Sequence, residues 1–173
     1  SDRAQFDHGR DRCGAPGQET EVAVARVAPL ADWPPPKRGA EMTDTTEMTD
    51  DERRTLVERF WQALGSRDFA AVGAMMSERG HYIDVPVIGV EPGAYGPAET
   101  EARLRLGLEP LSDYRLHPGL IVVTGEHVIT EHLEEWWWRD GEHAEVRFCS
   151  VMEVRNHKVD RWWDYVDLNS IFA

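Results

Sequence analysis

Hydrophobic side chains after residue 48 recur at the three- and four-residue spacing of a helix. The first stripe consists of Leu56, Val57, Phe60, Trp61 and Leu64. Thr49 or Asp50 is a suitable N-cap and Gly65 a suitable end, so this pattern predicts an amphipathic helix. Similar spacing predicts a second short helix over about residues 67–80, which forms a helical hairpin with the first, and a third over about 98–108.

Later stretches alternate between hydrophobic and polar residues, which is typical of strands. They cover residues 81–90, 113–123, 126–139, 143–155 and 159–168. Pro86 and Gly89 interrupt the first stretch, so we predict a short edge strand followed by a loop. Turn residues separate the other four, which predicts an antiparallel meander. Helices first and strands last indicate an α+β fold, with N-terminal helices packed in a strongly curved, mainly antiparallel sheet.

Residues 1–48 have no sustained periodicity, are rich in Gly, Pro, Asp, Glu, Thr and Ala, and contain three consecutive prolines. Such a segment does not bury enough apolar surface to fold by itself, so we expect a disordered leader or tail. Met42 and Met48 precede the first helix and favour a leader, a linker or an over-long start. An arm that binds a partner is the alternative. We predict one folded domain, residues 49–173.

The charge of the chain excludes two classes of partner. Lys and Arg number 19 and Asp and Glu number 32, which gives a formal net charge of -13 without any basic run. Nucleic acids and anionic membranes would be repelled, so we expect neither as a partner. No stretch approaches the roughly 20 apolar residues of a membrane span, and we expect a cytoplasmic protein. Cys13 and Cys149 lack metal-site spacing and are expected to be free thiols.

Strand alternation predicts a group of polar side chains on the inner face of the sheet. His132 and Glu134 share one face of the second meander strand with large aromatic residues. Asp164 stands between apolar neighbours on the last strand, and Tyr82 and Asp84 share a face of the first. Acids and a histidine enclosed by aromatic side chains perturb one another's proton affinity, as general acid–base catalysis requires.

Each of these residues also has a structural explanation when it is taken singly. Glu134 is compatible with a cross-strand salt bridge on a solvated face, and His132 with a structural histidine. Asp164 is compatible with an acid that caps a turn. The functional hypothesis therefore depends on the group as a whole.

Three stretches contain most of these residues: 81–86 (HYIDVP), 130–134 (TEHLE) and 162–168 (WWDYVDL). They resemble the limonene-1,2-epoxide hydrolase family, within the nuclear-transport-factor-2-like and SnoaL-like cone folds. The last stretch is the most specific, since the family has WRDYFDL there. The resemblance covers about residues 50–170 and implies a cone with an internal pocket.

The resemblance implies that Tyr82 helps to hold a water, that Asp164 is the general base, and that Glu134 protonates the epoxide oxygen. Asp84 replaces an Asn that holds the water, and His132 replaces an Arg that bridges the two acids. Histidine exchanges a permanent cation for one that titrates near neutrality. Three carboxyls in one pocket cannot all stay ionised, so at least one should hold a proton near neutral pH.

We therefore expect hydrolysis of a small lipophilic epoxide to a diol in one push–pull step, with no cofactor. The expected pocket wall consists of Trp61, Leu64, Trp136, Phe148, Trp162 and Val166. Such a wall suits a compact apolar substrate such as a terpenoid. The resemblance also implies a homodimer through the outer sheet face, where Trp137, Trp163 and Tyr165 are expected.

Two other functions stay open. In an isomerase or cyclase like the ketosteroid isomerases or SnoaL, Asp84 would abstract a proton beside a carbonyl while Tyr82 donates to the enolate. A cone of this kind can also simply bind a hydrophobic ligand, because fold does not determine function. A metal site built from Asp84, His132, Glu134 and Asp164 is a minor possibility, because carboxylate-rich groups without ordered spacing are common false positives.

Overall fold

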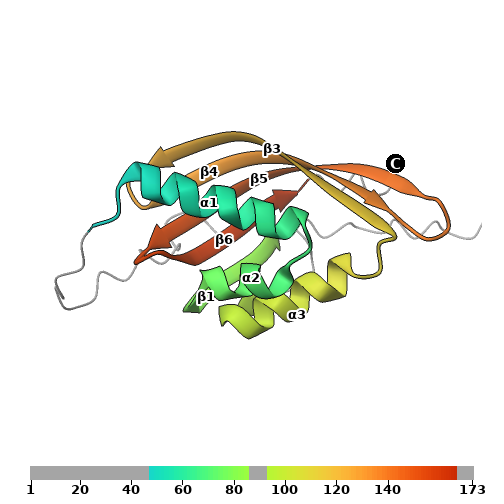
Figure 1. The fold of residues 1–173 in the computed structure, drawn as a ribbon, viewed down its shortest axis with the longest axis horizontal. Helices are drawn as coiled ribbons and strands as arrows, with labels where there is room; N and C mark the ends of the chain where they lie inside the picture. Colours follow the sequence, from blue (N-terminus) through green and yellow to red (C-terminus); the bar gives the residue numbers. More distant parts are fainter. Residues whose placement is uncertain (1–46, 86–92, 167–173) are drawn as a thin grey trace, which may run out of the picture. The chain divides into compact units, whose positions relative to one another are not determined.

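A computed structural model describes residues 47–85 and 93–166. The helices are α1 (Asp50–Gly65), α2 (Phe69–Met75) and α3 (Gly96–Leu108). The strands are β1 (Met76–Val85), β2 (Ala94–Tyr95), β3 (Asp113–Thr124), β4 (His127–Trp137), β5 (His143–Arg155) and β6 (Lys158–Val166). They form one sheet in the order β2-β1-β6-β5-β4-β3, which curves over α1, with α2 and α3 beside β1 (Figure 1). The predicted α+β fold is confirmed.

The first helix begins with a capping box at Thr49, one of the two predicted N-cap residues. The Thr49 hydroxyl accepts a hydrogen bond from the Glu52 amide at 3.2 Å, and the Glu52 carboxylate accepts one from the Thr49 amide at 2.7 Å. These bonds satisfy backbone groups that the start of a helix leaves unpaired. The stripe residues Val57, Phe60, Trp61 and Leu64 are all at most 2% exposed. The helix therefore packs this stripe against the sheet.

The second helix ends at Met75, and the prediction that it continues to near Gly80 was wrong. Met76 begins β1 and pairs with Val159 of β6. At Gly80 a Cβ would lie 2.8 Å from the Val159 carbonyl oxygen, which shows how closely the two backbones approach. Pairing with a distant strand therefore overrides the local helical pattern.

The strand predicted as an edge lies inside the sheet. β1 pairs with β6 in parallel, with Asp84 opposite Asp164, and with β2 in antiparallel on its other side. The edge prediction rested on Pro86 and Gly89, which lie outside the described residues. The parallel partner of β1 is about 80 positions later in the chain, which is why the local pattern did not indicate it.

The predicted antiparallel meander is confirmed. β3, β4, β5 and β6 pair in sequence order, each antiparallel to the next. Asn156 and His157 form the turn between β5 and β6 with φ of 49° and 59°. Two successive residues with positive φ match the twist of a tight hairpin. Asp167 and Leu168, which were predicted to continue the last strand, lie outside the described residues.

Met48, the residue just before the predicted domain, packs into the hydrophobic core and is 5% exposed. Its carbonyl accepts a hydrogen bond from the Arg53 guanidinium, and its sulfur accepts one from the His157 amide at 3.1 Å. Met48 therefore connects the start of α1 to the β5–β6 turn through these hydrogen bonds.

Candidate active site

The sheet aligns a row of polar residues across four neighbouring strands. Asp84 of β1 lies opposite Asp164 of β6, which lies opposite Ser150 of β5, which in turn lies opposite Thr130 of β4. Asp164, Ser150 and Thr130 are each at most 3% exposed. Because residues directly opposite in a sheet point to the same face, these side chains all lie on the inner face.

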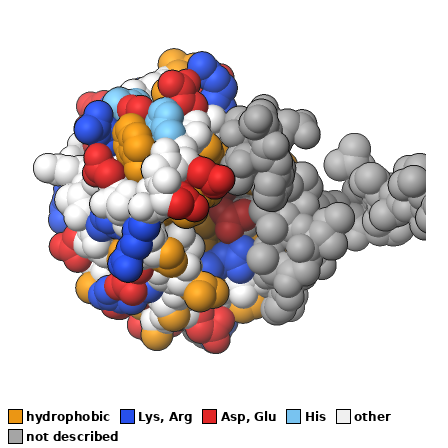
Figure 2. Space-filling view, turned by 90° about the vertical axis from the view of Figure 1, so that its right-hand side faces the viewer, with side chains coloured by type: hydrophobic (Ala, Val, Ile, Leu, Met, Phe, Trp, Pro, Cys, Tyr) orange, Lys and Arg blue, Asp and Glu red, His pale blue; other side chains and the backbone are white. Residues whose placement is uncertain are grey.

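This inner face borders a cavity of about 290 Å³. Its polar lining residues are Tyr82, Asp84, Arg103, Glu134 and Asp164. Its apolar lining includes five of the six predicted wall residues, namely Leu64, Trp136, Phe148, Trp162 and Val166, and also Leu104, Leu106, Gly107 and Leu108 of α3. Figure 2 shows acidic and basic side chains in a hollow beside hydrophobic ones. The sheet and α3 thus enclose charged groups within an apolar pocket.

Asp164 is the carboxyl with the most strongly altered proton affinity in this pocket. Burial raises its pKa from 3.8 to about 7, and the charges of Asp84 and Glu134 add to the rise, although the charge of His132 and a hydrogen bond from Ser150 oppose it. Trp162 Nε1 donates to Asp164 Oδ1 at 2.6 Å, and Ser150 Oγ donates to the same oxygen. Within the described residues Oδ2 accepts no hydrogen bond, so this oxygen can exchange a proton with a ligand or water.

Glu134 is held by two donors, one on each oxygen. The Tyr114 hydroxyl donates to Oε1 at 2.7 Å and Trp136 Nε1 donates to Oε2 at 2.7 Å. Burial raises the pKa of Tyr114 well above its ordinary range, so this phenol stays protonated and keeps donating. Because both oxygens accept, the carboxyl of Glu134 has a fixed orientation in the pocket wall.

His132 is not a pocket residue, and it does not form the predicted hydrogen-bonded bridge. Its side chain has no exposed surface and lies between Trp61 and Phe148, with ring centroids 4.4 Å and 4.9 Å away. Its Nε2 is 3.4 Å from Glu134 Oε1, and neither ring nitrogen forms a hydrogen bond within the described part of the chain. An imidazole is shorter than a guanidinium and does not span both acids. It acts on Asp164 through its charge alone.

The assignment of Trp61 to the pocket wall was also wrong. This side chain is 2% exposed and packs edge-on against Phe60 and Trp162 in the core. It touches the site only from behind, through the rings of Trp162 and His132. Since α1 crosses the concave face at this point, Trp61 lies behind the pocket and Leu64, one turn later, reaches it.

Tyr82 and Asp84 form a unit with Arg103 of α3, a residue that the sequence analysis did not identify. The Tyr82 hydroxyl donates to Asp84 Oδ1 at 2.8 Å, and Arg103 Nη2 donates to Asp84 Oδ2 at 2.8 Å. Burial and the charge of Asp84 raise the pKa of Tyr82 well above its ordinary range. Helical spacing could have revealed Arg103, because it falls on the same stripe as the buried Thr100 and Leu104.

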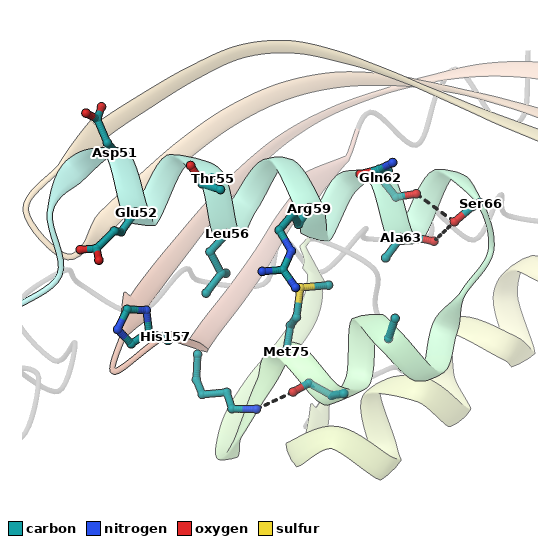
Figure 3. A pocket seen from close by; sticks show the side chains of 13 residues that line it. Asp51, Glu52, Thr55, Leu56, Arg59, Gln62, Ala63, Ser66, Met75 and His157 are labelled. Atoms are coloured by element: carbon teal, nitrogen blue, oxygen red, sulfur yellow. Dashed lines mark hydrogen bonds between the residues drawn. The ribbon is translucent and has the colours of Figure 1, made fainter.

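A larger groove lies on the other side of α1, between this helix, α2 and the β5–β6 turn (Figure 3). Its volume is about 840 Å³, and three of its polar side chains form local structural contacts. Glu52 belongs to the capping box, the Ser66 hydroxyl bonds backbone carbonyls of α1, and Lys158 Nζ donates to the Ala74 carbonyl at 2.6 Å. The smaller cavity, in which carboxyls converge, is therefore the candidate active site.

Among the described residues, no group of three or more His, Cys, Asp and Glu side chains could hold a metal ion. The metal site considered for the four titratable residues of the pocket is thus not formed. In the same ranges, 47–85 and 93–166, no helix is both long and apolar enough to cross a membrane.

Comparison of the sequence with models of protein families shows the family to which the chain belongs. Residues 57–162 match the model of the SnoaL-like domain family. The match covers more than half of the chain, and the protein belongs to this family. A search of curated proteins finds no match.

Solved structures with the same fold include an epoxide hydrolase, a protein described as a putative cyclase and a protein described by its fold alone. An LEH-like epoxide hydrolase of M. tuberculosis is 24% identical, with a TM-score of 0.60 over 70% of this chain and 87% of that one. A putative SnoaL-like polyketide cyclase from Shewanella putrefaciens is 12% identical, with a TM-score of 0.60 over 73% and 96%. A protein of ketosteroid isomerase-like fold from Catenulispora acidiphila is 15% identical, with a TM-score of 0.60 over 67% and 88%. At these identities the likeness shows a shared fold.

Proposed function

We propose that this protein hydrolyses a small lipophilic epoxide to a diol by direct attack of water. One observation carries the proposal: Asp164 has a pKa of about 7 and an oxygen without a hydrogen-bond partner in the described residues, and it shares an apolar pocket with Glu134. A carboxylate whose pKa is near the working pH is an effective general base, because it is ionised yet accepts a proton readily.

The proposed reaction needs one water and two carboxyls. A water held between Asp164 Oδ2 and the Tyr82–Asp84 pair loses a proton to Asp164 as its oxygen bonds to an epoxide carbon. The carbon–oxygen bond of the ring breaks, and the departing oxygen takes a proton from Glu134. Proton return from Asp164 through solvent to Glu134 resets the site. His132 is a positioning residue here: its Nε2 lies 3.4 Å from Glu134 Oε1, and a charge on its ring lowers the pKa of Asp164.

The size of the pocket limits the substrate. Its 290 Å³ is at the lower end of the roughly 300–1,000 Å³ that small-molecule sites occupy. Trp136, Trp162 and Phe148 form flat apolar walls around the carboxyls. These features favour a compact cyclic epoxide, such as a terpenoid one, over an extended lipid epoxide.

Isotope labelling tests the proposal. The protein is incubated with a panel of epoxides in ¹⁸O-labelled water, including limonene 1,2-epoxide and styrene oxide, and the products are analysed by mass spectrometry. We expect one labelled oxygen in the diol after a single turnover and no label in the protein, because no ester intermediate forms. Label in an Asp or Glu carboxyl would contradict direct attack, and absence of any diol would contradict the function.

One observation favours an isomerase or cyclase instead. Tyr82 donates to Asp84 at 2.8 Å, which is the pairing of a proton donor and a carboxylate that enolisation requires. However, both oxygens of this carboxylate are already engaged, Oδ1 by Tyr82 and Oδ2 by the ion pair with Arg103, which leaves neither free to take a proton from a substrate. Turnover of a β,γ-unsaturated ketone without epoxide turnover would favour this alternative, and binding that does not depend on pH would favour a non-catalytic role.

The pH dependence of the rate should report on His132. An imidazole can lose its charge, whereas a guanidinium keeps it at every working pH. His132→Arg places a permanent cation beside Glu134 and should therefore flatten the decline of the rate on the alkaline side. The measurement is kcat/KM of both proteins on the same epoxide from pH 5 to 10. An identical alkaline limb in the variant would show that His132 has only a structural role.

We also propose that a second copy of the chain binds the outer face of the sheet. Five strands contribute one apolar row to this face: Val122, Ile129, Val151, Trp163 and Ile83, each opposite the next. Val122 is 41% exposed and Ile129 is 38% exposed. A continuous apolar row on a surface with a strong net charge is typical of an interface.

Sedimentation of a lysine variant tests this interface. Val122→Lys together with Ile129→Lys introduces two cations into the row and should convert a dimer into a monomer. Thr55→Lys on the exposed side of α1 adds a similar charge elsewhere and should leave the dimer intact. A monomeric wild type at micromolar concentration would refute the proposed interface.

A further inference from the structure

Arg103 supplies the permanent cation of the pocket from a helix. Its Nε and Nη2 donate to Asp84 Oδ2 at 3.2 Å and 2.8 Å, and its guanidinium carbon lies 5.3 Å from the centroid of the Tyr82 ring. The Arg103 side chain is 18% exposed and that of Asp84 is 23% exposed. Burial lowers the pKa of Arg103, but the charge and hydrogen bonds of Asp84 outweigh this effect and raise it. The pair therefore remains ionic within the pocket.

Asp84 is also a strand partner of Asp164. The two residues are opposite each other in the parallel β1–β6 ladder, and both line the cavity. Like charges on neighbouring strands oppose each other, and the charge of Asp84 accordingly adds to the rise in the pKa of Asp164. The donors around them differ: Asp84 accepts from a cation and a phenol, whereas Asp164 accepts from a hydroxyl and an indole.

We propose that Arg103 is a positioning residue that holds Asp84 in its ionised form, so that the exchangeable proton of the Asp84–Asp164 pair resides on Asp164. Arg103 does not contact the reacting atoms. It determines which of the two carboxyls exchanges a proton with water, and it offsets the negative charge that Asp84 would otherwise impose on Asp164. This assignment rests on the proposed function only for its kinetic test.

Other titratable groups face this pair from several elements, and none replaces Arg103. β1 contributes Tyr82, β4 contributes His132 and Glu134, and β3 contributes Tyr114. The two phenols are neutral, and the lining residue from α1 is the apolar Leu64. Among these groups only His132 can become a cation, and its ring does not line the cavity but lies between Trp61 and Phe148. The cavity therefore depends on Arg103 for permanent positive charge.

Replacement of Arg103 tests the assignment. Arg103→Gln removes the cation, so ionisation of both Asp84 and Asp164 becomes less favourable. The midpoint of the acid limb of kcat/KM, which reports the ionisation of Asp164, should therefore rise above 7. We expect a rise of about one pH unit, equivalent to a tenfold loss of kcat/KM at the low-pH end of the profile. Arg103→Lys keeps a cation and should restore most of the midpoint. Arg105→Gln is the matched control, since Arg105 lies on the exposed face of α3, paired with Glu101 and Glu109, and it should not move the midpoint.

A double-variant cycle separates this role from a general structural one. Asp84→Asn removes the charge through which Arg103 acts, so it should lower the midpoint, and Arg103→Gln should then have no further effect. An unchanged midpoint in Arg103→Gln, or an equal shift with and without Asp84, would overturn the assignment. If Arg103→Gln does not fold, Asp84→Asn tests the assignment by itself. An unchanged midpoint of the acid limb in Asp84→Asn would refute the coupling between Asp84 and Asp164.

Carboxyl ¹³C NMR titration of Asp164 in the same proteins gives an answer that does not depend on turnover. If the titration midpoint of Asp164 shifts as expected but no epoxide is turned over, the role of Arg103 is supported and the proposed function is refuted. If an epoxide is turned over but the midpoint of Asp164 is the same with and without Arg103, the proposed function is supported and the role of Arg103 is refuted.

Discussion

Asp164→Asn is expected to lower kcat/KM for an epoxide by about 10²-fold or more, the usual scale for loss of a general base. The side chain keeps its volume but no longer accepts a proton from water. The remaining activity should also lose the acid limb near pH 7, because that limb belongs to the carboxyl of Asp164. Retention of more than about a tenth of the wild-type kcat/KM would refute the role of Asp164 as base.

This substitution is well matched to its surroundings, so a loss of activity can be separated from a loss of folding. Both hydrogen bonds to Asp164 end on Oδ1, one from Trp162 and one from Ser150. The carbonyl oxygen of Asn can accept both, and its amide takes the place of Oδ2. The variant therefore leaves neither Trp162 nor Ser150 without an acceptor.

The stability of the same variant has a predictable pH dependence. Burial raises the pKa of Asp164 from 3.8 to about 7, so the folded state binds this proton more tightly than the unfolded chain. The resulting stabilisation is complete below about pH 4 and is lost as the pH rises to about 7. Asn carries no charge at any pH. Thermal melts should show that the melting temperature of the variant rises relative to that of the wild type between pH 5 and 8. A relative fall over this range would contradict a buried carboxylate at position 164.

The alternation of polar and apolar residues along the strands was the sequence pattern that best predicted which residues face the pocket. A period of two fixes the face of a side chain as soon as the strand is recognised. Glu134 and Asp164 therefore lie in the pocket as predicted, and Glu131 on the opposite face of the same strand is exposed. Tyr82 and Asp84 likewise share a face, since they are two positions apart.

The residues that were missed depend on contacts between distant elements. Arg103 reaches Asp84 only because α3 packs on β1, and Tyr114 reaches Glu134 only because β3 pairs with β4 in one register. His132 was assigned to the correct face, but its depth depends on Trp61 and Phe148, which enclose it. Spacing along one chain segment predicts a face, whereas depth and partner require the packed structure.

The proton balance of the site depends on these missed contacts. Sequence reasoning expected at least one protonated carboxyl but could not say which. Arg103 engages Asp84, two neutral donors engage Glu134, and Asp164 is left with burial as the dominant influence on its pKa. Different partners around three similar groups thus divide the roles of base, acid and fixed anion among them.

Glu134→Gln should reduce kcat/KM by about 10²-fold, and the size of the loss should depend on the substrate. The proposed acid protonates the departing oxygen, so its loss matters less when that oxygen is a better leaving group. An epoxide with an electron-withdrawing substituent next to the departing oxygen should therefore lose much less rate than a terpenoid epoxide. Asp164→Asn should reduce both rates by similar factors, since either epoxide needs the same base to take a proton from the attacking water.

A matched variant and a stability measurement complete the Glu134 test. Gln can accept from Tyr114, but its amide faces the Trp136 N–H with a second donor, so a loss of about 1–3 kcal/mol of stability is expected. Glu131→Gln, on the exposed face of β4, should change neither rate nor stability. An equal loss on both epoxides would mean that Glu134 holds the pocket in shape through Tyr114 and Trp136, and that the departing oxygen takes its proton from another group.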